Sequence, residues 1–202
     1  MCSTCLPRSF FARPTLEVAR GLLGMRLVRN LNGTRLSGWI VETEAYIGET
    51  DLACHARAGK TPRTVVMYGP PGHAYIYFTY GIHWMLNTVT EAEGFPAAVL
   101  LRAIQPVEGL EEISARRAGV PPAHWTDGPG KLCRALGLDG RQNGLSLCDP
   151  SGELYIETGP GVPDTEVRVG PRVGIQSTPE PWRSMPWRFR AQFRPGCGIN
   201  EV

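Results

Sequence analysis

Apolar and polar residues alternate over several short stretches of the chain, and turn-forming residues separate these stretches. A period of two residues is typical of half-buried strands, whereas a period near 3.6 indicates helices. Asn32-Gly33 is a strong signal for a two-residue hairpin between strands expected at 25–31 and 34–46. Gly81 separates a strand rich in aromatic residues, 74–80, from its returning arm.

Further elements complete a mixed pattern of helices and strands. We expect additional strands at 82–90, 97–104, 153–157 and 167–175, and helices at 15–23, 109–118 and 130–138, with a shorter helix near 51–58. Residues 158–166 form an expected loop, and the segment 181–194, rich in Trp and Arg, carries no assignment.

The composition is that of a folded protein. The chain has 202 residues, 42% hydrophobic and 20% charged, which excludes disordered and fibrous classes. No apolar run approaches the ~20 residues of a membrane span, and residues 1–7 lack the features of a signal peptide. We therefore expect a cytoplasmic protein without a membrane partner, whose six cysteines are mostly reduced.

Charge is distributed unevenly along the chain. The net charge is only +2, but residues 1–63 carry nine Lys or Arg against five acids, and residues 91–112 carry one Arg against five acids. The charge distribution is therefore compatible with a basic face that binds nucleic acid. The only lysines are Lys60 and Lys131.

The densest candidate chemistry lies in Val41-Glu42-Thr43-Glu44-Ala45-Tyr46. On a strand, Glu42, Glu44 and Tyr46 share one face. Such a face can be a solvated edge. The preceding residues are apolar, however, and a half-buried carboxylate with a raised pKa can act as a general base.

The hairpin around Gly81 is the second candidate. We expect Tyr75, Ile76 and Phe78 to pack in the sheet. Tyr80 lies beside the glycine at the tip, where burial in its own sheet is difficult, and this favours an interaction wedge.

The remaining motifs are weaker. The four histidines show no helical metal-ligand spacing, and Cys2-x-x-Cys5 has no second pair, so no metal site is expected. The glycine segments 69–72 and 127–131 lack the residues of a P-loop. Gly130-Lys131 begins a helix pattern. The N-terminus of this helix, together with Lys131, either binds a phosphate or is simply the start of a helix without a ligand.

Taken in order, a set of motifs resembles the alkyladenine (3-methyladenine) DNA glycosylases. The agreement extends from about residue 8 to residue 190. The motifs are Val-Glu-Thr-Glu-Ala-Tyr (41–46), His55 with Arg57, Thr61-Pro-Arg63, Tyr77 with Tyr80-Gly81, Asn87, Leu100-Leu-Arg102-Ala, Pro106-x-Glu108-Gly, Gly128-Pro-Gly-Lys-Leu-Cys133 and Arg172-Val-Gly174.

The resemblance implies one α+β catalytic domain over 1–202, with frayed or divergent ends at 1–7 and 191–202. Its fold is expected to have a curved antiparallel sheet, surrounding helices and a protruding β-hairpin that intercalates into DNA.

The resemblance also implies roles for individual residues. Glu44 matches the general base, and Arg102 matches the arginine that helps hold the attacking water and this glutamate. The others are Tyr46, His55 and Tyr77 as walls around a flipped base, Asn87 as the pocket floor, Tyr80 as the intercalating residue and Lys131 as a phosphate contact.

The implied activity is excision of alkylated or deaminated purines from double-stranded DNA by a monomeric enzyme without a cofactor. A bifunctional glycosylase needs an amine. Lys60, Lys131 and the N-terminal amine all fall outside the matched pocket, so the expected product is an uncut abasic site. If the source is bacterial, we expect association with the nucleoid. A non-catalytic nucleic-acid-binding module and a zinc-dependent hydrolase stay as alternatives.

Overall fold

The hairpin signal at Asn32-Gly33 produces the first strand pair of the structure, a computed structural model that describes residues 4–191. Both turn residues have positive φ, 50° for Asn32 and 81° for Gly33, a conformation that Asn and Gly tolerate. The turn joins β1 (Arg26–Leu31) to β2 (Thr34–Ile47), with Leu31 opposite Thr34. The strands agree with those expected from the alternation.

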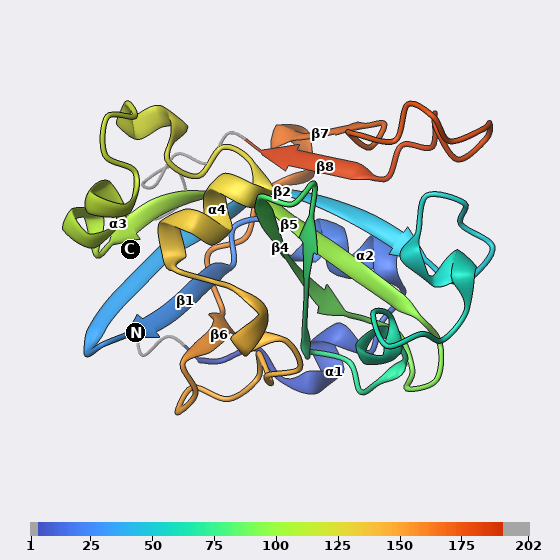
Figure 1. Cartoon of the computed structure of the whole chain (residues 1–202), viewed down its shortest axis with the longest axis horizontal. Helices are drawn as coiled ribbons and strands as arrows, with labels where there is room; N and C mark the ends of the chain where they lie inside the picture. The colour runs from blue at the N-terminus through green and yellow to red at the C-terminus, as the bar shows by residue number, and fades with distance from the viewer. Residues whose placement is uncertain (1–3, 192–202) are drawn as a thin grey trace.

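The long strand β2 organises one antiparallel sheet of eight strands (Figure 1). Along its length β2 pairs with β5 (Ala97–Glu108), and on its other edge it pairs first with β1 and then with β8 (Arg188–Ala191). The order is β3-β4-β5-β2-β1-β6, and β7 pairs with β8. The remaining strands are β3 (Ala74–Thr79), β4 (His83–Val89), β6 (Leu154–Glu157) and β7 (Val167–Gly170).

Short helices cover this sheet, which confirms the predicted α+β class. In Figure 1, α2 lies behind the long strands, and α4 packs against β4 and β5. The α-helices are α1 (Arg8–Phe11), α2 (Thr15–Gly21), α3 (Leu110–Arg116) and α4 (Pro129–Leu136), and the 3₁₀ helices are His55–Ala58, Val65–Tyr68, Pro122–His124, Gly140–Gln142 and Asp164–Glu166. None of the helices within residues 4–191 is long and apolar enough to cross a membrane.

Three segments differ from the sequence predictions. The strand expected at 167–175 ends at Gly170, because Pro171 has no N–H for a ladder and Arg172 turns into the interior. Strand β8 lies in the segment that carried no assignment. Residues 4–6, expected to fray, lie along β6, where the Leu6 amide donates to the Ile156 carbonyl at 2.8 Å. Residues 1–3 and 192–202, which include Cys2, lie outside the described residues.

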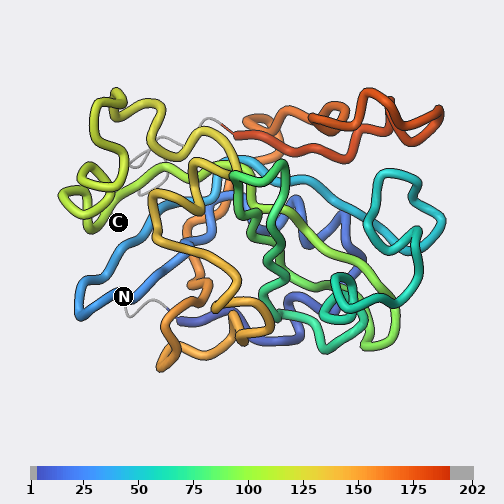
Figure 2. The backbone as a smooth tube through the Cα atoms, viewed as in Figure 1, coloured from blue at the N-terminus to red at the C-terminus, as the bar shows by residue number. Residues whose placement is uncertain are grey.

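A buried ion pair between Arg172 and Asp51 fixes the segment after β7 against the loop that follows the C-terminal end of β2. Figure 2 shows this C-terminal segment, in orange and red, beside the cyan part of the chain. The two Arg172 Nη atoms donate to the carboxylate of Asp51 at 2.5 and 2.9 Å, across 121 positions of sequence, and both side chains are fully buried. The same guanidinium donates to the Ala45 carbonyl at 3.0 Å.

We expect Asp51→Asn to lower the free energy of unfolding by about 3–5 kcal/mol, because it leaves the Arg172 charge buried without a counterion. The matched control is Asp164→Asn, which breaks an Arg20 ion pair whose aspartate side chain is 93% exposed. That loss is expected to stay below about 1 kcal/mol. Urea denaturation checks both variants, and equal losses would contradict an anchoring role for the Asp51–Arg172 pair.

Candidate active site

The alternation along β2 divides its side chains between two faces. Thr43 lies on one of these faces, and its hydroxyl donates to the Ala19 carbonyl of α2 at 2.7 Å, so the face with Thr43 packs against the core. Glu42 and Glu44 point the other way, and the side chain of Arg102 on β5 contacts both. The structure therefore brings together the carboxylates and the arginine that the sequence predicted.

The carboxylate of Glu44 is fully buried and accepts three hydrogen bonds. Oε1 accepts from the backbone N–H of Val173 at 2.7 Å, and Oε2 accepts from the Tyr46 hydroxyl at 2.9 Å and from Arg102 Nη1 at 3.3 Å. Burial raises the pKa of Glu44 above its ordinary value, although Arg102 and the Val173 amide act in the opposite direction. Glu44 is therefore a better base than a solvated glutamate.

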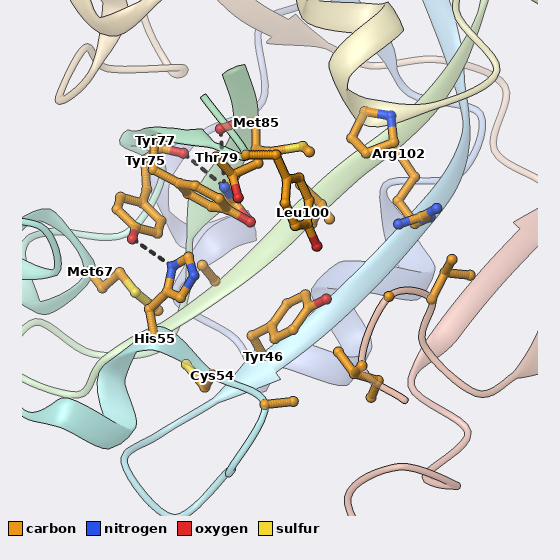
Figure 3. Close-up of a pocket in the computed structure, with 18 residues that line it drawn as sticks. Tyr46, Cys54, His55, Met67, Tyr75, Tyr77, Thr79, Met85, Leu100 and Arg102 are labelled. Carbon is orange, nitrogen blue, oxygen red and sulfur yellow. Dashed lines mark hydrogen bonds between the residues drawn. The ribbon is translucent and has the colours of Figure 1, made fainter. Parts of the chain in front are cut away.

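A cavity of about 280 Å³ lies next to this carboxylate. Tyr46, Arg102 and Val173 line the cavity and also contact Glu44, which itself lies just behind this wall. In Figure 3 the ring of Tyr46 stands apart from a cluster made by His55, Tyr75 and Tyr77. The cavity lies between aromatic groups from separate elements, an arrangement suited to a flat ligand.

His55 is held as a neutral ring in the wall of the cavity. Its Nδ1 lies 3.0 Å from the Tyr75 hydroxyl, and its ring meets the ring of Tyr77 edge-on at 4.5 Å. Arg63 Nη2 lies 3.4 Å from His55 Nε2 and can only donate to it. Burial, together with the smaller effects of the Arg63 and Arg57 charges, lowers the pKa of His55 to about 4.

Asn87 lies on β4 and lines the same cavity, buried to 3% exposure. Its Nδ2 donates to the Tyr75 carbonyl at 2.9 Å and to the Met85 carbonyl at 3.4 Å. These two bonds fix the orientation of the amide, so Asn87 presents a rigid shape to anything that enters.

Tyr80 lies at the tip of the β3–β4 hairpin and is 78% exposed. Its φ of 52° is in the left-handed region, which is unfavourable for an aromatic residue and marks strain at an exposed position. Tyr75 and Ile76 are buried as expected, but Phe78 is half-exposed and packs on Trp84 at 4.8 Å instead of inside the sheet. The reason is that β3 is an edge strand and its outer end extends beyond the core.

Lys131 lies in the first turn of α4, outside the cavity lining. Its Nζ donates to Asp127 Oδ1 at 2.8 Å, and the side chain remains 44% exposed. Within residues 4–191, His, Cys, Asp and Glu side chains do not gather in a group of three that could hold a metal ion.

Sequence reasoning missed three contacts of the site. It did not find the Val173 amide on Glu44, the buried position of Arg172 behind the Tyr46 ring at 4.7 Å, or the contact of Arg188 with Glu42 at 3.4 Å. The motif Arg172-Val-Gly174 was part of the resemblance but carried no role. A backbone amide leaves no signature in residue type, so only this motif could have pointed to it.

Comparisons with known proteins agree on one family. A family model described as methylpurine-DNA glycosylase (MPG) matches residues 9–195. A relative from Myxococcus xanthus (strain DK1622) is 52% identical over 91% of this chain and 88% of its own length. One from Methanocella arvoryzae (strain DSM 22066 / NBRC 105507 / MRE50) is 52% identical over 91% of this chain and 90% of its own length. One from Bacillus thuringiensis (strain Al Hakam) is 44% identical over 94% of this chain and 96% of its own length. All three carry the name "Putative 3-methyladenine DNA glycosylase".

We expect the imidazole of His55 to titrate with a midpoint near pH 4 and Arg63→Gln to raise this midpoint, because a cation beside the ring disfavours its protonation. Since the folded-state pKa lies below the unfolded value of 6.5, this group makes stability fall as pH drops from 6.5 toward 4. NMR of the ring protons measures the midpoint.

Arg57→Gln is the matched control, since Arg57 is the weaker of the two charge effects, and it should raise the midpoint less. A midpoint that is unchanged in Arg63→Gln would contradict the electrostatic role of Arg63.

Proposed function

The chain belongs to the methylpurine-DNA glycosylase family, and from this premise we propose that it extrudes damaged purines from duplex DNA and hydrolyses their N-glycosidic bond. Family membership makes the protein a DNA-3-methyladenine glycosylase that acts on DNA. The proposed substrates are alkylated or deaminated purines of the 3-methyladenine, 7-methylguanine, hypoxanthine and ethenoadenine class. The observation that carries the mechanism is the buried Glu44 carboxylate beside the aromatic cavity.

Base extrusion is proposed because a base inside a duplex cannot reach a cavity of this kind. The exposed, strained Tyr80 lies at the rim of the cavity. In the proposed complex its ring fills the gap that the extruded nucleotide leaves, and this replaces part of the lost stacking. Tyr46, His55 and Tyr77 then enclose the base. Tyrosine faces attract a methylated, cationic purine by roughly 0.5–2 kcal/mol per ring.

The proposed chemistry uses one water molecule and the Glu44 carboxylate. Water enters from the cavity between Arg102 and Val173, which both line it and both contact Glu44. The water oxygen bonds to C1′ through an oxocarbenium-like transition state, by analogy with glycoside hydrolysis. The C1′–N bond breaks with its electrons on the departing base, and Glu44 takes the water proton.

A cationic lesion leaves as a neutral base, so it needs no general acid. Neutral lesions need a proton or a hydrogen-bond donor at the base. The proposed product is an uncut abasic site, since neither Lys60 nor Lys131 lines the cavity to form a Schiff base.

Two further residues have proposed roles at the DNA. Asn87, fixed in orientation at the cavity floor, excludes the 2-amino group of guanine by shape. Lys131 exchanges its exposed Asp127 partner for a phosphate near the start of α4. We further propose one domain over 1–202 that works as a monomer, at the nucleoid if the source is bacterial.

We expect Glu44→Gln to retain binding to lesion-containing duplex and to lose about 10²–10⁴-fold in single-turnover excision, the range typical of a positioned general base. Glu111→Gln, which changes an exposed glutamate of α3, is the matched control and should excise at the wild-type rate. Near-normal excision by Glu44→Gln would remove Glu44 from the mechanism.

Tyr80→Ser should reduce excision most for a stably paired lesion and less for the same lesion in a mismatch or bulge, where extrusion costs less free energy. The melting temperature should hardly change, since the side chain is exposed. Single-turnover excision in both contexts and a thermal melt are the measurements. An equal loss in both contexts would contradict the wedge role.

A further inference from the structure

Two carboxylates share the guanidinium of Arg102, and the nearer one is not Glu44. Arg102 Nε donates to Glu42 Oε1 at 2.8 Å, whereas Nη1 reaches Glu44 Oε2 only at 3.3 Å. Glu42 does not line the cavity, and its side chain is only 17% exposed. Its place is therefore behind the reacting groups, where it can act only through Arg102 or through its charge.

We propose that Glu42 is a positioning residue that holds Arg102 and so keeps the Glu44 carboxylate basic enough to take the proton of the attacking water. This inference rests on the proposed function of Glu44. Without Glu42, the guanidinium is free to turn the donors on both Nε and Nη1 toward Glu44. A full ion pair of that kind stabilises the carboxylate and weakens it as a base.

Charge around Glu44 agrees with this role. The charge of Glu42 raises the pKa of Glu44, in the same direction as burial, while Arg102 lowers it. The other titratable or charged groups around Glu44 and Glu42 come from several elements. They are Tyr46 on β2, Tyr77 on β3, Arg188 on β8, which contacts Glu42, and the Arg172–Asp51 pair behind Tyr46. Arg188 contacts Glu42 directly, so a control variant at Arg188 is needed to isolate the effect of Glu42.

The test is the pH profile of single-turnover excision of 7-methylguanine, a cationic base whose departure needs no general acid. The acid limb of the profile then reports protonation of the general base, Glu44. In Glu42→Gln, which keeps the volume of the side chain and one acceptor oxygen, we expect this limb to move to lower pH by about one unit. The plateau rate should fall about tenfold, less than the 10²–10⁴-fold loss typical of removing a positioned base, because Glu44 itself is still present.

Arg188→Gln is the matched control, because it breaks the same contact between Glu42 and β8 but leaves Glu42 on Arg102. Its acid limb should stay or move to higher pH. Glu42→Asp keeps the charge with a shorter reach, and its limb should lie between those of the wild type and Glu42→Gln. A thermal melt of each variant confirms that the protein is folded.

An acid limb in Glu42→Gln that coincides with the wild type would overturn the inference. So would equal changes in Glu42→Gln and Arg188→Gln, which indicate a purely structural contact, or a Glu42→Asp limb equal to that of Glu42→Gln. Failure of the proposed function is a separate result, namely excision that persists in Glu44→Gln under the same conditions.

Discussion

The burial of one carboxylate, that of Glu44, is the constraint on which the site depends. A buried charge needs hydrogen-bond donors from several directions, and these come from segments far apart in sequence. Tyr46 belongs to the same strand, Arg102 to β5, and Val173 to the segment after β7. The antiparallel pairing of β2 with β5 and the Asp51–Arg172 ion pair bring these donors to one point.

The same burial makes the site a source of instability. A carboxyl group whose pKa is higher in the folded state than in the unfolded state makes the folded protein bind a proton more tightly. The contribution of Glu44 to stability therefore declines as pH rises from 4.5 to its folded-state value. The ionised form that can accept a proton is the form that folding disfavours, and stability comes from the core around α2 and the sheet instead.

Local patterns predicted much of the fold and of the site, whereas long-range pairings were beyond them. The alternation in 41–46 placed Glu42, Glu44 and Tyr46 on one face, because strand period is a local property. The end of β7 at Gly170 and the existence of β8 depend on pairing with distant strands. Phe78 was predicted to be buried, because the sequence does not reveal that the outer end of an edge strand extends beyond the core. The resemblance supplied residue identities, but the donors to Glu44 became visible only in three dimensions.

The proposed mechanism requires that a water held at Glu44 attacks C1′ of a nucleotide whose purine lies in the cavity between Tyr46 and Tyr77 and departs as the leaving group. The decisive experiment is a crystal structure of Glu44→Gln bound to a duplex with a single lesion. We expect the lesion base in the cavity, the Tyr80 ring in the vacated stack, and a water between residue 44 and C1′. A lesion base that stays in the duplex, or that leaves the duplex but lies outside the cavity, would contradict it.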